Sequence, residues 1–301
     1  MTIAVTGATG FVGQRLLEVA AQRGLKLRAL TRRDQPARDG VTWVRGDLED
    51  APALAELVAD TSAIIHIAGV INAPDREGFE VGNVTGTANL LIAAQAANVP
   101  RFVHVSSLAA REPDLSLYGG SKARSEALVQ QSGITHAIVR PPAVYGPGDR
   151  ETLELFKMAK RGLVVLPPEG RMSAIHADDL SALLLDLAAA PHLDGPIFEP
   201  DDGSEGGFTH QAFAKALGKA VGTDPKTISM PAALVKAGAR IDRLFRREQA
   251  KLTPDRAAYF CHPNWVVAPD KRPPASLWTP SITTEQGLVD TARWYRDKGW
   301  L

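Results

Sequence analysis

Short apolar runs in the first half of the chain alternate with segments in which apolar residues recur every three or four positions. The short runs are typical of strands buried on both faces, and the periodic segments are typical of amphipathic helices. The predicted strands are 3–6, 25–31, 41–46, 63–68, 101–106 and 137–140, and the predicted helices between them are 11–22, 51–59, 82–97 and 119–131. This alternation predicts an α/β fold with a doubly wound parallel sheet, whose ligand binds at the carboxyl ends of the strands.

The pattern changes after Pro141, where proline and glycine become frequent and the strands become shorter. Helices are predicted at 153–160, 177–190, 209–221 and 231–246. We therefore expect two domains, a dinucleotide-binding domain at 1–150 and a substrate-binding lobe at 151–301 that can return a strand or helix to the first.

One helix of this second half, 232–247, is both apolar and strongly basic. Its apolar residues are Leu234, Val235, Ile241, Leu244 and Phe245, and its basic residues are Lys236, Arg240, Arg243, Arg246 and Arg247. The pattern favours a packed helix with a solvated basic face. A membrane surface or a partner-binding surface is the alternative.

The first predicted strand ends in three glycines, Gly7, Gly10 and Gly13, directly before the first helix. Glycine permits a tight turn and a close ligand, and the N–H groups of a helix N-terminus attract an anion. A pyrophosphate suits this position, so the run 3–13 predicts a dinucleotide-binding turn and a Rossmann-like sheet.

Composition narrows the class of protein. The 301 residues include 34 basic and 34 acidic side chains, so no basic footprint for nucleic acid is indicated. Cys261 is the only cysteine, which excludes an intrachain disulfide and a thiolate metal cluster. No secretory signal and no run of about 20 apolar residues is present, so we expect a cytoplasmic protein without a membrane span.

Candidate chemistry follows the fifth strand. Ser106 and Ser107 stand at its end, and Tyr118 and Lys122 lie four positions apart in the helix that follows. Residues at this spacing share a helix face, and a nearby ammonium lowers the pKa of a phenol. Such a phenol exchanges a proton with a substrate oxygen, while a serine hydroxyl donates a hydrogen bond to the same atom.

With these residues in place, the chain resembles the extended short-chain dehydrogenases/reductases, the group with the nucleotide-sugar epimerases and dehydratases, the 3β-hydroxysteroid dehydrogenases and the dihydroflavonol reductases. The matching segments are 6–13, 46–48, 66–69, 83–87, 105–107, 118–122, 140–148 and 175–180. The resemblance covers most of the chain to about residue 200, and 287–301 resembles the C-terminal helix of the reductase-like members.

The resemblance implies catalytic roles. Ser107, the second serine of the pair, polarises the substrate oxygen, Tyr118 is the acid/base, and Lys122 tunes the phenol and binds the nicotinamide ribose. Asn83 is implied to kink its helix and support a proton-relay water, and a helix N-terminal cap is its alternative. His176, Asp178 and Asp179 belong to a structural motif in the family, so no metal site is predicted.

The cofactor is predicted to be NADP(H) rather than NAD(H). The second strand runs into Arg32 and Arg33 where NAD-binding relatives carry an acidic residue, and a guanidinium pairs with a 2′-phosphate. A solvated loop is the alternative for these arginines. The predicted cofactor-binding residues are Gly7, Thr9, Gly10, Phe11, Val12, Gly13, Arg32, Arg33, Asp47, Leu48, Ala68, Gly69, Tyr118, Lys122, Pro142 and Val144.

We therefore expect an NADP(H)-dependent oxidoreductase that interconverts a carbonyl and a secondary alcohol. A nucleotide-sugar epimerase or dehydratase with tightly held cofactor and a non-catalytic NAD(P)-binding accessory protein are the alternatives. Val70, Tyr145 and Arg171 are the candidate substrate residues. The partner is a small-molecule substrate, and the helices at 82–97 and 119–131 are candidates for a homodimer contact.

Overall fold

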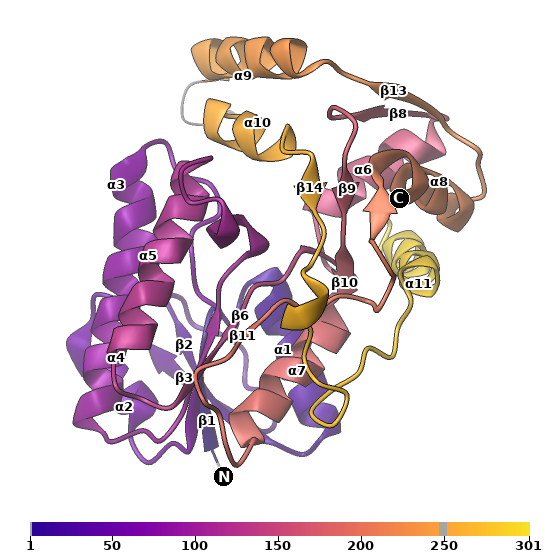
Figure 1. The fold of residues 1–301 in the computed structure, drawn as a ribbon. Helices are drawn as coiled ribbons and strands as arrows, with labels where there is room; N and C mark the ends of the chain where they lie inside the picture. Colours follow the sequence, from indigo (N-terminus) through magenta and orange to yellow (C-terminus); the bar gives the residue numbers. More distant parts are fainter. Residues whose placement is uncertain (1, 247–251) are drawn as a thin grey trace. The chain divides into compact units, whose positions relative to one another are not determined.

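The computed structural model describes residues 2–246 and 252–301, which form two compact units (Figure 1). Unit 1 comprises the described residues up to Arg140 together with Asp178–Glu199 and Pro273–Thr279. Unit 2 comprises the described residues of Pro141–Ala177, Pro200–Arg272 and Pro280–Leu301. Arg247, predicted to lie in the basic helix, falls outside the described residues.

Unit 1 contains a seven-stranded sheet in which every neighbouring pair is parallel, in the order β11-β6-β5-β4-β1-β2-β3. Its strands are β1 (Thr2–Thr6), β2 (Lys26–Thr31), β3 (Val41–Arg45), β4 (Ala63–His66), β5 (Phe102–Val105), β6 (His136–Val139) and β11 (Ile197–Phe198). The central strands consist of apolar residues that are buried on both faces. The predicted doubly wound parallel sheet is confirmed.

Helices cover both faces of this sheet (Figure 1). They are α1 (Phe11–Gln22), α2 (Ala51–Val58), α4 (Gly86–Ala96), α5 (Leu117–Gln131) and α7 (Ala177–Ala189), and the short α3 (Arg76–Phe79) packs against α5. The ion pairs Arg15–Asp178 and Arg23–Asp186, each 2.6 Å, join α1 to α7 on one face. On the other face, α4 packs between α2 and α5.

The strand order reverses at β1, which lies between β2 and β4. A ligand of such a sheet binds in the crevice at the carboxyl ends of these two strands. Both ends carry residues that the sequence assigns to the cofactor, the glycine turn after β1 and Ala68-Gly69 after β4.

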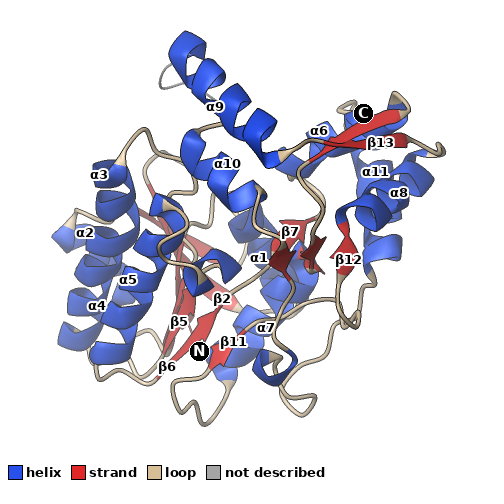
Figure 2. Cartoon of the chain, turned by 45° about the horizontal axis from the view of Figure 1, so that its top comes forward, coloured by secondary structure: helices blue, strands red, loops and turns tan. Residues whose placement is uncertain are grey.

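Unit 2 is built from helices and three small sheets, drawn as red arrows in Figure 2. Its strands are β7 (Ala143–Tyr145), β8 (Leu163–Leu166), β9 (Arg171–Met172), β10 (Ala174–His176), β12 (Phe208–Thr209), β13 (Lys226–Ser229) and β14 (Asn264–Trp265). Its helices are α6 (Glu151–Lys160), α8 (His210–Val221), α9 (Ala232–Arg246), α10 (Pro254–Phe260) and α11 (Thr284–Asp297). Its core combines aliphatic and aromatic side chains, and Phe156 packs edge-on against Tyr295 there.

Two features depart from the predicted elements. The first residues of the predicted helix at 82–97 belong to a π-helical turn, Glu80–Thr85, and α4 begins only at Gly86. The favoured interpretation of the basic helix as one that buries its apolar face is wrong, because Leu244 and Phe245 of α9 are exposed. None of the helices in the described residues is long and apolar enough to cross a membrane.

Candidate active site

The turn after β1 is so tight that two of its glycines leave no room for a side chain. Gly7 has φ +76°, and a Cβ on it would lie 2.6 Å from the backbone nitrogen of Ala68. A Cβ on Gly13 would collide with the carbonyl oxygen of Gly7. Strand β1, the start of α1 and the end of β4 therefore meet at close range, as a dinucleotide-binding turn requires.

The N-terminus of α1 has no side-chain cap. Gly10 is the capping residue and has no side chain to accept a hydrogen bond, and the first turn carries no acidic residue. In α2, α5 and α8, by contrast, the side chains of Asp50, Ser116 and Thr209 accept a backbone N–H. The first N–H groups of α1 thus stay available to an anion, which fits the pyrophosphate of a dinucleotide.

The structure brings the predicted serine and tyrosine together. Ser107 follows β5, Tyr118 lies in the first turn of α5, and their side chains form a hydrogen bond. Ser106 points elsewhere, because its hydroxyl donates to the Glu126 carboxylate at 2.5 Å. Ser107, the second serine, is therefore the one that contacts Tyr118.

Lys122 lies one helical turn after Tyr118 and is buried. Its ammonium donates to the carbonyl oxygen of Val105 at 2.8 Å. The ammonium also lies 3.7 Å from the position that a Cβ on Gly69 would take, so it stands at the carboxyl ends of β4 and β5. Burial lowers the pKa of Lys122 to about 8, against the opposing charge of Glu126.

The expected lowering of the Tyr118 pKa by Lys122 is not found. Burial raises the pKa of Tyr118 above its ordinary value, and the hydrogen bond with Ser107 opposes this only in part. The free-energy cost of removing a phenolate from water exceeds the stabilisation that the hydrogen bond with Ser107 gives it. Tyr118 therefore carries its proton at neutral pH, which suits a proton donor.

Asn83 does not cap a helix, so that alternative is wrong. It lies inside the π-helical turn, where its side chain accepts from the Val70 nitrogen at 2.6 Å and donates to the Val70 oxygen at 2.9 Å. It also donates to the Ser121 hydroxyl at 2.8 Å. The widened turn thus ties the segment after β4 to α5, and Val70 is engaged through its backbone.

The sequence analysis missed a buried ion-pair network behind the site. Arg140 donates to both oxygens of Glu126, at 2.8 and 2.5 Å, and lies 3.8 Å from Glu199, which also pairs with Arg111. Glu126 continues the helix face of Tyr118 and Lys122 by one more turn, and this spacing could have revealed it. The network joins α5 to the ends of β6 and β11.

Two stacked histidines, His66 and His104, lie in the sheet with ring centroids 5.4 Å apart. His66 is bonded to Thr6 at 2.6 Å and to Thr87 at 3.0 Å, whereas Nδ1 of His104 has no partner within the described residues. Burial and then the charge of Lys122 lower the pKa of His66 to about 3. Burial likewise lowers the pKa of His104, so both imidazoles are neutral in the core.

Arg32 and Arg33 are exposed after β2. The Arg32 guanidinium makes no hydrogen bond or ion pair with the described residues, and Asp34 is turned toward Arg45 at 2.6 Å. No carboxylate thus competes for Arg32. Asp47 is exposed after β3, and its carboxylate accepts from the backbone nitrogen of the nearby Glu49.

Four of the predicted residues lie in unit 2, in or beside its strands β7 and β9. Pro142 directly precedes β7, which contains Val144 and Tyr145. The expectation that Tyr145 faces the substrate is wrong, because its ring is buried in the core against His176. Arg171 in β9 donates to the carbonyl oxygens of Gly206 and Gly207. Its guanidinium is therefore engaged in holding a loop.

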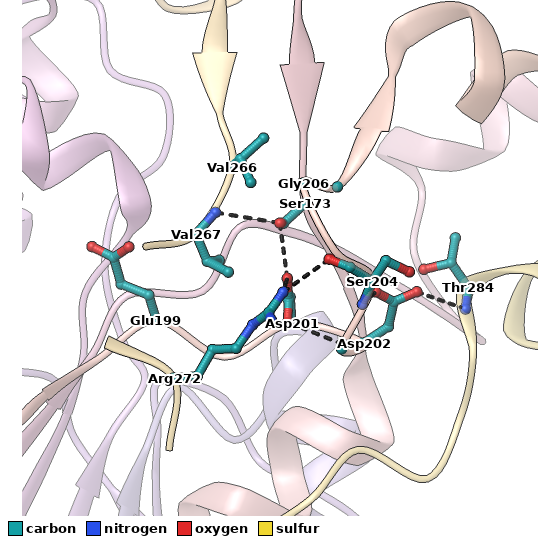
Figure 3. A network of polar contacts seen from close by, with 12 residues as sticks. Ser173, Glu199, Asp201, Asp202, Ser204, Gly206, Val266, Val267, Arg272 and Thr284 are labelled. Atoms are coloured by element: carbon teal, nitrogen blue, oxygen red, sulfur yellow. Dashed lines mark hydrogen bonds and ion pairs between the residues drawn. The ribbon is translucent and has the colours of Figure 1, made fainter. Parts of the chain in front are cut away.

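Unit 2 has a polar network of its own, shown in Figure 3. The Asp201 carboxylate accepts from Ser173 at 3.0 Å and from Arg272 at 2.9 Å. The neighbouring Asp202 accepts from the backbone nitrogen of Thr284 at 3.0 Å. Segments far apart in sequence are joined here. No cluster of metal-ligating side chains occurs in the described parts of the chain.

The chain is similar to several known proteins. The sequence profile of the NAD dependent epimerase/dehydratase family matches residues 3–196. A ceramide reductase of Caulobacter vibrioides is 38% identical over 99% of this chain and 96% of its own length. A 2-alkyl-3-oxoalkanoate reductase of Stenotrophomonas maltophilia is 27% identical over 96% and 97%.

Among solved structures, the Bordetella bronchiseptica enzyme WbmG in complex with NAD and UDP is similar with a TM-score of 0.75. It is 17% identical, and the match covers 99% of this chain and 96% of that one. A likeness at this identity shows the α/β fold alone.

Proposed function

Because the chain belongs to the NAD dependent epimerase/dehydratase family, we propose that it is an NADP(H)-dependent ketoreductase acting on a carbonyl carried by a long apolar chain. It is an oxidoreductase of the extended short-chain dehydrogenase/reductase group and uses a nicotinamide dinucleotide. The observation that carries the proposal is the hydrogen-bonded pair Ser107–Tyr118 with the buried Lys122 one turn further on.

These side chains perform the acid–base part of a carbonyl reduction. Tyr118, protonated at neutral pH, donates its phenolic proton to the substrate oxygen as negative charge develops there. Ser107 donates a hydrogen bond to the same oxygen. Lys122 is mostly protonated below its pKa of about 8, and its ammonium at the carboxyl ends of β4 and β5 would bind the nicotinamide ribose, as the resemblance to the family implies.

The residues of unit 1 fit the cofactor. The uncapped N-terminus of α1 and the close approach at Gly7 would hold the pyrophosphate, and Asp47 with Leu48 would contact the adenine. A bound nicotinamide dinucleotide supplies the hydride. Arg32 has no partner among the described residues and would pair with a 2′-phosphate, which favours NADP(H). Arg33 is the second candidate.

The names of two relatives support this substrate class. The ceramide reductase, whose substrate name denotes a lipid, matches almost the whole chain. The 2-alkyl-3-oxoalkanoate reductase is named for a ketone within an alkyl chain and also matches almost end to end. We therefore place the reactive carbonyl of this enzyme's substrate on a fatty chain.

A turnover assay with both reduced cofactors tests the proposal. We expect the purified protein to oxidise NADPH in the presence of a 3-ketoceramide or a 2-alkyl-3-oxoalkanoate, with NADPH preferred over NADH. Turnover of a UDP-sugar without net oxidation of the cofactor would instead identify an epimerase. Cofactor binding without turnover of either substrate class would identify an accessory protein, and both results contradict the proposal.

A further inference from the structure

Helix α9 exposes the large apolar side chains that an amphipathic helix normally buries. Leu234 is 55% exposed, Ile241 57%, Leu244 75% and Phe245 80%. Leu234, Ile241 and Phe245 follow one another at intervals of seven and four residues, which places them on one face of the helix. Leu244 borders that face, so the exposed side chains form one apolar stripe.

The packed side of α9 is a different face. Ala239 is fully buried and Val235 is half-buried, whereas the residues of the stripe stay outside. Helix α10 packs against α9, and both views show α9 at the margin of unit 2 with α10 on one side (Figures 1 and 2). Unit 2 thus holds α9 by its small residues and turns its large apolar residues outward.

The charge of α9 differs from that of the rest of the chain. Its sequence contains Lys236, Arg240, Arg243 and Arg246 against the single acid Asp242, so the helix carries a net charge of +3 (four minus one). The whole chain is neutral. Lys236 and Arg240 are exposed, and Arg240 lies one helical turn before Leu244, so part of this charge borders the stripe.

The strand before α9 adds to the apolar surface. In the two-stranded sheet of β8 and β13, Val165 is paired in register with Ile228. Val165 is 43% exposed and Ile228 is 52% exposed. Only Met230 and Pro231 separate β13 from α9, so the exposed apolar residues of the sheet and the helix are close along the chain.

We propose that α9 docks unit 2 onto an anionic lipid bilayer. The apolar stripe enters the boundary between headgroups and acyl chains, and Lys236 and Arg240 pair with lipid phosphates. The helix has fifteen residues and a strongly charged face, so it lies in the plane of the interface. A second copy of α9 would bring like charges together, whereas an anionic surface matches both the apolar and the basic residues.

This inference does not depend on the chemistry proposed for unit 1. It assigns a surface, and its test is binding rather than turnover. If the substrate carries a fatty chain, the same surface would bring the enzyme to the membrane that holds it.

Vesicle co-sedimentation of the full-length protein tests the proposal. We expect binding to vesicles with about one third phosphatidylglycerol, weak binding to pure phosphatidylcholine, and release by salt. The variant L244S/F245S replaces two residues of the stripe. It should bind the vesicles at least tenfold more weakly, because both apolar side chains are lost from the lipid interface. Removal of two charges in K236Q/R240Q should weaken binding to the anionic vesicles about 30-fold.

Two control variants test whether the loss of vesicle binding is specific to α9. I92S changes an exposed apolar residue of α4 in unit 1, and K215Q/K219Q removes two charges from α8 in unit 2; both should bind like the wild type. Unchanged thermal unfolding of every variant shows that folding is intact. The proposal is overturned if the wild type ignores anionic vesicles, if the controls lose binding equally, or if light scattering shows that L244S/F245S merely dissociates a lipid-independent dimer.

Discussion

Buried polar side chains gather around Lys122 in unit 1 and around Asp201 in unit 2, but the two groups are held differently. In unit 1, burial moves the pKa values of Lys122, Tyr118 and His66 away from their ordinary values, and the groups lie near the carboxyl ends of strands. In unit 2, the Asp201 carboxylate is engaged by Ser173 and Arg272 and ties loops together. The first arrangement is the one that we propose for chemistry, and the second holds loops of unit 2 together.

The largest expected effect separates activity from stability in unit 1. Replacing Tyr118 by phenylalanine removes the proton donor, so we expect turnover to fall about a thousandfold, or about 4 kcal/mol. Thermal unfolding and NADPH affinity should stay close to the wild type. A variant that keeps its turnover would show that the hydroxyl does not act as the acid.

In unit 2 we expect the opposite result, a loss of stability without a loss of turnover. Replacing Asp201 by alanine leaves Arg272 without its buried carboxylate, so the free energy of unfolding should fall by about 3 kcal/mol in a urea titration. The folded fraction should retain its turnover per molecule. Asp270→Ala, at an exposed position of the same unit, is the control and should unfold like the wild type. Equal stability of the two variants would contradict a structural role for the network.

Acid should weaken unit 1 through its histidines. The pKa of His66 is about 3 when folded and 6.5 ordinarily, so the unfolded chain binds more protons below pH 6.5 and stability is lost as pH falls. Between pH 6.5 and 5 we expect the free energy of unfolding to fall by about 2 kcal/mol for this residue.

Variants at two histidines check the origin of this acid sensitivity. His66→Asn should reduce the slope of unfolding free energy against pH, whereas His192→Asn, at an exposed position, should leave the slope unchanged. An unaltered slope in the His66 variant would place the acid sensitivity elsewhere.

The smallest expected effect concerns the exposed arginines that follow β2 in unit 1. Arg32→Gln should raise the KM for NADPH about tenfold and leave the KM for NADH unchanged, since only NADPH carries the 2′-phosphate. Lys26→Gln removes the same charge at the other end of β2 and should change neither constant. If Arg33→Gln shows the larger effect, Arg33 rather than Arg32 is the contact.

Unit 1 could be predicted well because the patterns that define its elements lie within short segments of the sequence. Apolar runs define the strands, the glycine spacing defines the turn, and Tyr118 and Lys122 lie within one helix. Glu126 follows the same helical spacing but was missed, because its partner Arg140 lies at the end of another strand. The two residues meet only after the sheet has formed, so the spacing along the chain does not indicate their pairing.

Unit 2 was predicted less well because its contacts join distant segments. Tyr145 follows a proline-rich turn, which suggested a loop near the substrate, yet it lies in the core with Leu288 and Tyr295. The two-residue strands β9, β12 and β14 carry no periodic signal and form only against one another. The apolar stripe of α9 was visible in the sequence, but its outward orientation depends on which face packs against the unit.

Unit 1 is formed by segments that lie far apart in the sequence, and this affects how it folds during synthesis. Its sheet is completed by β11, a strand encoded far beyond β6, and the unit also includes Pro273–Thr279. A nascent chain emerging from the ribosome cannot close this unit when Arg140 appears, because its last strand has yet to be translated. Truncation at that point should yield an aggregation-prone fragment with an open strand edge rather than an isolated nucleotide-binding domain.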